Sequence, residues 1–186
     1  MFPIVLDLNL LRVGLVGQGR AALQRLRLLD EDNARHVQVF CEERDKELSD
    51  TAGDRLLRRL PTRDEIAGLN ILFIAGLPGA QARALANQAR EEGVLVNTED
   101  VKDLCDFHMP ASVRRGDLLL SVSTGGASPG LARRLKSTLS CQFGPEWSAR
   151  VEEISFQRQQ WRDAGMDLPT VSQRTDEFIN EKGWLS

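Results

Sequence analysis

Short apolar runs alternate along this chain with stretches in which apolar residues recur at helical spacing. Residues 12–16 form the first apolar run, a glycine-containing turn follows, and leucines then recur at a helical period as far as Leu29. The next apolar run spans residues 37–40. A strand, a turn, a helix and a second strand within about 30 residues have the size of a βαβ unit, so we expect parallel strands and a right-handed crossover.

The same alternation continues toward residue 110. The expected elements are a strand near residues 55–60, a short helix after Thr62, a strand over 70–75, an alanine-rich helix over 79–92 and a strand over 94–97. Residues 41–67 are otherwise charged and weakly patterned. Strands that alternate with helices favour an α/β fold with a parallel sheet covered on both faces.

The pattern changes after Pro110. A strand over residues 118–123 is followed by helices over residues 129–143, 146–164 and 170–182. We therefore expect a Rossmann-type domain over residues 1–112, a central region over 113–144 and a small helical domain over 145–186. The apolar start, residues 1–8, is interpreted as a structured edge segment.

Composition restricts the functional class. The chain has 186 residues, 41% of them hydrophobic and 27% charged, and its net charge of −3 argues against a nucleic-acid partner. No secretory leader pattern or run of transmembrane length is present, so we expect a cytoplasmic protein without a membrane partner. Cys41, Cys105 and Cys141 lack metal-ligand spacing and predict reduced thiols. With two histidines in the chain, we expect no metal site.

A glycine motif follows the first expected strand. Gly17 and Gly19, with the small residue Ala22 three positions later, fit a dinucleotide-binding turn that opens a helix. Glu42 and Glu43 follow the second strand, where a carboxylate binds the ribose hydroxyls of NAD. The alternative is that these two glutamates form only a solvated loop, and the neighbouring arginine at position 44 leaves NADP open.

A second loop of small residues joins the strand over 118–123 to the helix that begins near residue 129. Thr124 and Ser128 offer hydroxyl groups, Gly125 and Gly126 allow close backbone approach, and Ser128 can cap the helix. The helix N-terminus favours an anionic ligand in this loop. A well-capped turn without a ligand is the alternative.

Three blocks of sequence, taken in order, resemble one known family. They are residues 2–8 leading into 13–19, residues 96–111, and residues 114–133. Together they are similar to the precorrin-2 dehydrogenase / sirohydrochlorin ferrochelatase family, which forms the N-terminal module of sirohaem synthases and also occurs as stand-alone proteins. Gln18 replaces the middle one of three glycines usual in that family, and residues 76–79 replace a Thr-Asp-Asp segment.

The resemblance implies oxidation of precorrin-2 to sirohydrochlorin with NAD as cofactor, and some members also take Fe²⁺ as a substrate to form sirohaem. It implies a homodimer with residues 113–144 as the dimerisation region. The family's central aspartate corresponds to Asp100, which we expect to act as a catalytic base, the alternative being a cap on the short helix that follows. The expected cofactor contacts are Gly17, Gln18, Gly19, Arg20, Ala21, Glu42 and Glu43, and the expected substrate contacts are Asn97, His108, Arg114, Thr124, Gly125, Gly126 and Ser128.

Some alternatives stay open on the sequence. His108 is either a proton shuttle during metal insertion or a buried structural histidine. A non-catalytic NAD- or tetrapyrrole-binding protein would account for Gln18 and for the replaced segment at residues 76–79. A general NAD-dependent oxidoreductase for small substrates lacks support, because the chain has no tyrosine for a Tyr-x-x-x-Lys pair. The chain ends before a methyltransferase domain could begin, so we expect a stand-alone module or a fragment.

Overall fold

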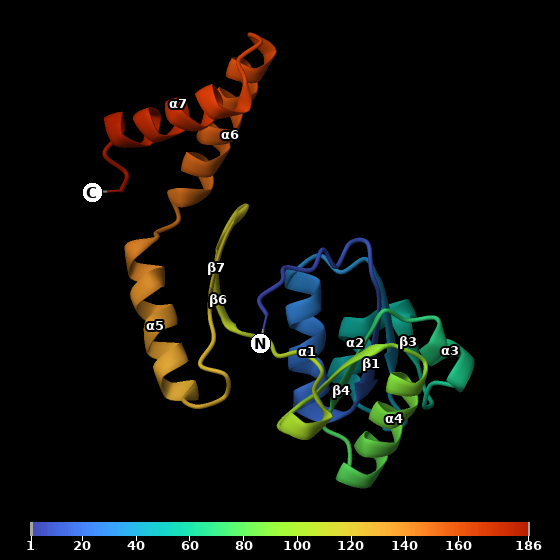
Figure 1. The fold of residues 1–186 in the computed structure, drawn as a ribbon. Helices are drawn as coiled ribbons and strands as arrows, with labels where there is room; N and C mark the ends of the chain where they lie inside the picture. The colour runs from blue at the N-terminus through green and yellow to red at the C-terminus, as the bar shows by residue number, and fades with distance from the viewer. Residues whose placement is uncertain (1, 186) are drawn as a thin grey trace. The chain divides into compact units, whose positions relative to one another are not determined.

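The chain divides into two compact units, Met1–His108 and Met109–Ser186, in a computed structural model that describes residues 2–185 (Figure 1). The break precedes strand β6 (Ala111–Arg115), so this strand belongs entirely to the second unit. Within the described part of the chain, every helix is too short or too polar to traverse a lipid bilayer.

The first unit contains a five-stranded sheet in the order β3-β2-β1-β4-β5, and all of its neighbouring strands are parallel. The strands are β1 (Arg12–Gly17), β2 (His36–Phe40), β3 (Leu56–Leu57), β4 (Ile71–Ala75) and β5 (Leu95–Thr98). The helices are α1 (Gly19–Glu31), α2 (Lys46–Ala52), α3 (Arg63–Ala67) and α4 (Gly79–Glu91), with 3₁₀ turns η1 (Gly53–Arg55) and η2 (Lys102–Leu104). The expected α/β fold with a Rossmann-type parallel sheet is confirmed.

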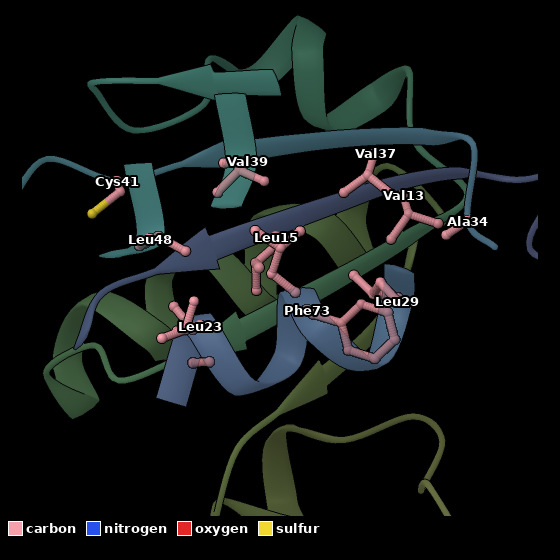
Figure 2. Close-up of a cluster of buried hydrophobic side chains, with 14 of the residues drawn as sticks. Val13, Leu15, Leu23, Leu29, Ala34, Val37, Val39, Cys41, Leu48 and Phe73 are labelled. Atoms are coloured by element: carbon pink, nitrogen blue, oxygen red, sulfur yellow. The ribbon is translucent and has the colours of Figure 1, made fainter. Parts of the chain in front are cut away.

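Two apolar layers cover the two faces of this sheet. Val13 and Leu15 of β1 and Phe73 of β4 point toward α1 and α2, and Figure 2 shows this cluster. Val16 and Ile74 point the other way, toward α3 and α4. Side chains of a strand alternate between faces, so burial of all of β4 and of β1 beyond Arg12 needs apolar residues at every position. Each fully buried aliphatic side chain contributes roughly 1.5–3 kcal/mol, and this core fixes the loops at the ends of the strands.

Helix α3 begins with a capping box that also holds an ion pair. The Thr62 hydroxyl accepts from the Glu65 amide, and the Glu65 carboxylate accepts from the Thr62 amide at 2.8 Å. Arg59 donates to both Glu65 carboxylate oxygens at 2.6 Å. The hydrogen bonds from Arg59, together with the one from the Thr62 amide, lower the pKa of Glu65 to about 2.

The second unit begins with a hairpin of β6 and β7 (Leu118–Val122), in which Arg115 pairs with Leu118 across the turn. Gly116 takes a φ of 58° in this two-residue turn, a conformation suited to glycine. Helix α5 (Pro129–Gln142) packs against both strands, and α6 (Trp147–Asp163) packs against α7 (Leu168–Glu181). The three expected C-terminal helices are therefore present.

Three features differ from the sequence-based expectations. Residues 2–8 form no strand, so the edge segment expected at 1–8 is wrong for them; Met1 lies outside the described residues. Pro3 removes a backbone donor there, and Phe2 and Val5 are exposed rather than packed on a neighbouring strand. Helix α2 was not expected, because its seven residues are mostly polar. Strand β6 was not expected either, because Val113 is its single buried side chain.

Candidate functional site

The sheet order has a switch point between β1 and β4. From β1 the chain continues to β2 on one side, whereas β4 and β5 lie on the other, so the strand order reverses between β1 and β4. Ligands of open α/β sheets bind at such a switch point. The loops after the two strands meet there, because the Gln18 amide donates to the Ala75 carbonyl oxygen at 3.1 Å.

In the turn after β1, open space surrounds the position where a side chain of residue 19 would lie, but no such space exists at Gly17. A Cβ atom on Gly17 would lie 2.1 Å from the Ala75 carbonyl oxygen, so only glycine fits between β1 and β4. Gly19 has a φ of 64°, and a Cβ atom built on it meets nothing within 4 Å. The structure thus supplies a tight turn beneath an unfilled space, which is the shape a pyrophosphate requires.

Helix α1 begins at this space without a side-chain cap. Gln18 occupies the N-cap position and its side chain accepts no hydrogen bond from the first turn. The free amide groups and the helix dipole favour an anion at the start of such a helix. Arg20 is exposed in the first turn and Ala21 is half-buried next to it. The five predicted cofactor residues from 17 to 21 therefore lie together at the uncapped start of α1.

The two departures from the family pattern fit this turn without backbone strain. Gln18 has an extended backbone, with a φ of −149°, so no glycine is needed at its position. Gly76 has a φ of 68°, and a Cβ atom there would lie 2.3 Å from the Gln18 carbonyl oxygen. The turn therefore accepts a side chain at position 18. The loop after β4 can approach the backbone of this turn closely because residue 76 is glycine.

The loop after β2 carries the predicted ribose ligands. Glu42 and Glu43 are exposed, and the Gln81 side chain on α4 donates to the Glu42 carboxylate at 3.3 Å. The Cys41 thiol donates to the Glu43 carbonyl oxygen at 3.4 Å and fixes the start of the loop. Burial raises the pKa of that thiol, so it is not a reactive thiolate. A cavity of about 460 Å³ adjoins this loop, lined by Arg44, Asp45, Lys46, Ser49, Asp50 and Arg58.

Asp100 lies just beyond β5, at the same edge of the sheet. The amide of the preceding residue, Glu99, donates to the Ile74 carbonyl oxygen at 2.9 Å and ties the segment to the end of β4. Asp100 is exposed and has a φ of 57°. The capping alternative is wrong, because the N-cap residue of η2 is Val101 and no side chain caps this turn.

The two other predicted site residues of this unit differ in exposure. Asn97 is buried, and its side-chain amide donates to the Phe107 carbonyl oxygen at 2.9 Å. His108 is exposed, so the alternative of a buried structural histidine is wrong. Sequence analysis did not identify Cys105 and Asp106, whose side chains bond to the backbone of β5. A cysteine and an aspartate directly after the short turn η2 were the available signal.

The loop between β7 and α5 is organised by its own hydroxyl groups. The Thr124 hydroxyl accepts from the Ser128 amide at 3.1 Å, and the Ser128 hydroxyl caps α5 by accepting from the Leu131 amide at 3.3 Å. Gly125 and Gly126 have φ values of 63° and 84°. The expected Ser128 cap is confirmed. The remaining predicted substrate residue, Arg114, lies exposed on β6 (Ala111–Arg115).

Within residues 2–185, histidine, cysteine and acidic side chains form no cluster of three that could hold a metal ion. The chemical features of the first unit are the uncapped start of α1 at an open glycine turn and an exposed carboxylate at the same edge of the sheet.

Comparisons with known proteins add sequence relatives to this geometry. A family model described as "Putative NAD(P)-binding" matches residues 4–111. The siroheme synthase of Methylococcus capsulatus is 38% identical over 141 residues, which are 74% of this chain and 29% of that relative. The siroheme synthase of Chromobacterium violaceum is 33% identical over 177 residues, which are 86% of this chain and 37% of that relative.

A solved structure, that of SirC, precorrin-2 dehydrogenase, is similar with a TM-score of 0.77 and 23% identity, covering 100% of this chain and 93% of that one. This likeness shows the fold. The chain spans 29% to 37% of the length of the two curated relatives.

Proposed function

Because the chain belongs to the NAD(P)-binding family and has siroheme synthases among its sequence relatives, we propose that it is a precorrin-2 dehydrogenase that uses NAD⁺. The observation that carries this proposal is the uncapped start of α1 above an open glycine turn, with an exposed carboxylate at the same edge of the sheet. The fold likeness to SirC is consistent with it.

The cofactor residues have separate tasks in this proposal. The first amides of α1 bind the pyrophosphate, and Gly19 leaves the room for it. Glu42 and Glu43 bind the ribose hydroxyl groups, which favours NAD⁺ over NADP⁺. Arg20 contributes a cation beside the phosphates. Gln18 and Ala21 shape the walls of the turn between them.

The proposed reaction removes two hydrogen atoms from precorrin-2, one as a hydride and one as a proton, to give sirohydrochlorin. NAD⁺ held at the turn after β1 would supply the hydride acceptor. The Asp100 carboxylate accepts the proton, because it lies at the edge of the sheet where ligands bind and is exposed to them. The electron pair of the broken C–H bond leaves with the hydride, so the macrocycle is oxidised by two electrons.

The second unit contributes substrate recognition and assembly. Precorrin-2 carries many carboxylates, and Arg114 together with the Thr124 and Ser128 hydroxyls offers a cation and hydrogen-bond donors for them. We propose residues 113–144 as a dimerisation region. A two-stranded hairpin covered by one helix is marginal alone, and α5 exposes Leu131 and Leu135.

A second activity, insertion of Fe²⁺ into sirohydrochlorin to give sirohaem, is proposed on the exposure of His108. An exposed imidazole can accept the pyrrole protons that the metal displaces. A non-catalytic binding protein would share this nucleotide turn, into which Gln18 and Gly76 both fit, so turnover of precorrin-2 is the measurement that separates the two.

Anaerobic incubation with precorrin-2 and NAD⁺ tests the dehydrogenase. We expect the visible spectrum of sirohydrochlorin and formation of NADH in equal amounts. Asp100→Asn keeps a residue that tolerates the left-handed backbone and removes the base, so turnover should fall while NAD⁺ binding persists. NAD⁺ binding without any turnover of precorrin-2 would instead identify a binding protein. Addition of Fe²⁺ or Co²⁺ then tests chelation as loss of sirohydrochlorin above the uncatalysed rate.

A further inference from the structure

Asp100 has a backbone conformation that side chains disfavour. Among residues 2–185, the non-glycine residues with positive φ are Asn33, in the turn after α1, and Asp100, with a φ of 57°. A residue remains in this left-handed region only where its surroundings hold it there. The contacts of the segment from β5 to Phe107 therefore indicate why Asp100 adopts it.

The thiol of Cys105 is the centre of these contacts. It donates to the Thr98 carbonyl oxygen at 3.0 Å, and it accepts from the Thr98 amide at 3.3 Å. It also lies 3.3 Å from the Val101 carbonyl oxygen. Residues 98 and 101 flank Glu99 and Asp100, which form the tip of this loop. The one sulfur atom therefore holds the backbone at both ends of the tip.

Two further side chains hold the segment against β5. The Asp106 carboxylate accepts from the Val96 amide at 2.9 Å and from Arg90 of α4 at 2.9 Å. The buried Asn97 side chain donates to the Phe107 carbonyl oxygen at 2.9 Å and lies 3.7 Å from the Cys105 sulfur. These side chains bind backbone atoms on both sides of the tip; Asn97 is buried, whereas Asp106 is exposed.

The carboxylate at the tip is left without such contacts. In the described part of the chain, no hydrogen bond or ion pair engages the Asp100 side chain, although its backbone is fastened on both sides. The same contacts also seat Leu104 in the core, where it is 2% exposed. These contacts therefore either only stabilise the packing of Leu104 or, in addition, hold the Asp100 carboxylate in a fixed position.

We propose that Asn97, Cys105 and Asp106 form a positioning network that holds the Asp100 carboxylate in its reactive place at the edge of the sheet. The inference rests on the proposed function, because it requires Asp100 to be the base. It also gives Asn97 a role different from substrate contact: its amide acts through the loop. None of the three side chains touches the reacting atoms.

A double-mutant cycle separates positioning from packing. Cys105→Ala removes the hydrogen bonds to Thr98, whereas Cys105→Ser keeps a donor and an acceptor there. We expect Cys105→Ala to lower kcat by about 10- to 100-fold, since a small misplacement of a catalytic group costs that much. The dissociation constant of NAD⁺ should not change, and Cys105→Ser should restore most of the rate. Exposed Lys102, in the same loop, provides the control, Lys102→Ala, which should behave as the unmodified chain.

The decisive comparison is made without the base. In an Asp100→Ala background, Cys105→Ala should have no further effect on kcat, because there is no carboxylate left to position. A wild-type kcat for Cys105→Ala, or an equal loss with and without Asp100, would overturn the proposal. Should Cys105→Ala fold poorly, Asn97→Ala is measured in the same cycle.

One measurement does not depend on enzymatic turnover. Amide hydrogen exchange by NMR reports the opening of the loop, and Cys105→Ala should speed exchange at the Leu104 and Asp106 amides while the exchange rates of β1 stay unchanged. Unchanged exchange at both amides overturns the proposal even if the enzyme is inactive. Absence of dehydrogenase activity in the unmodified chain would refute the proposed function but not the positioning of the loop. Failure of the proposed function and failure of the positioning network are therefore distinguishable.

Discussion

Replacing Gly19 with alanine tests whether the pyrophosphate lies at the turn after β1. Gly19 has a φ of 64° with nothing within 4 Å of the added Cβ, so the free protein loses only the cost of a left-handed alanine. That cost is about 1 kcal/mol. In the complex the same methyl group occupies the space of the pyrophosphate. Overpacking of this kind costs roughly 1–3 kcal/mol, which corresponds to NAD⁺ binding weaker by about 5- to 150-fold.

Gly93→Ala is the matched control. Gly93 follows α4, has a φ of 75° and also leaves its Cβ position open, but it is far along the chain from the nucleotide turn. Urea unfolding should show a similar loss of stability in both variants, while isothermal titration calorimetry should show weaker NAD⁺ binding in Gly19→Ala alone. Equal NAD⁺ affinity in the two variants would refute a pyrophosphate at this turn.

Further predictions address three other sites. Arg59→Ala should raise the pKa of Glu65 from about 2 toward its ordinary value, as a carbon-detected NMR titration would show. Because the pKa of Glu65 is depressed in the folded chain, its ionised carboxylate stabilises the folded chain at every pH above the ordinary pKa of a glutamate, and this stabilisation is lost as the pH falls toward 2. The Arg59→Ala variant lacks this stabilisation, so its acid unfolding should begin at a higher pH. Ser128→Ala removes the cap of α5 and should lower the free energy of unfolding by about 1 kcal/mol, with Trp147 fluorescence as the probe; Ser128→Thr should retain most of it. His108→Ala should slow Fe²⁺ insertion without changing NADH formation, and an unchanged insertion rate would remove the proton-shuttle role.

The central part of the fold could be predicted because strands that are buried on both faces need apolar residues at consecutive positions. Strands β1 and β4 are covered on both faces, so they read as continuous apolar runs. The start of α5 was equally clear, since Ser128 followed by Pro129 is a local signal that needs no tertiary contact. The glycine turn was predictable for the same reason, because its spacing follows from one strand and one helix.

Elements that depend on distant partners could not be predicted in this way. Strand β6 exists because β7 pairs with it, and Val113 is its single buried side chain. The contacts of Cys105 and Asp106 with β5 likewise join residues whose periodicity says nothing about hydrogen bonds to a neighbouring backbone. The left-handed backbone of Asp100 is tolerated by aspartate but is not specified by it.

The close approach of the loops after β1 and β4 makes residues 18 and 76 unequal targets for directed evolution. In a randomised library, position 18 should accept charged, bulky or small residues, because its backbone is extended like that of any ordinary strand residue. Position 76 should return glycine almost exclusively, because any larger residue there must push the neighbouring carbonyl oxygen aside. Variants that reshape the nucleotide turn would therefore be found first at position 18, with the loop after β4 left as it is.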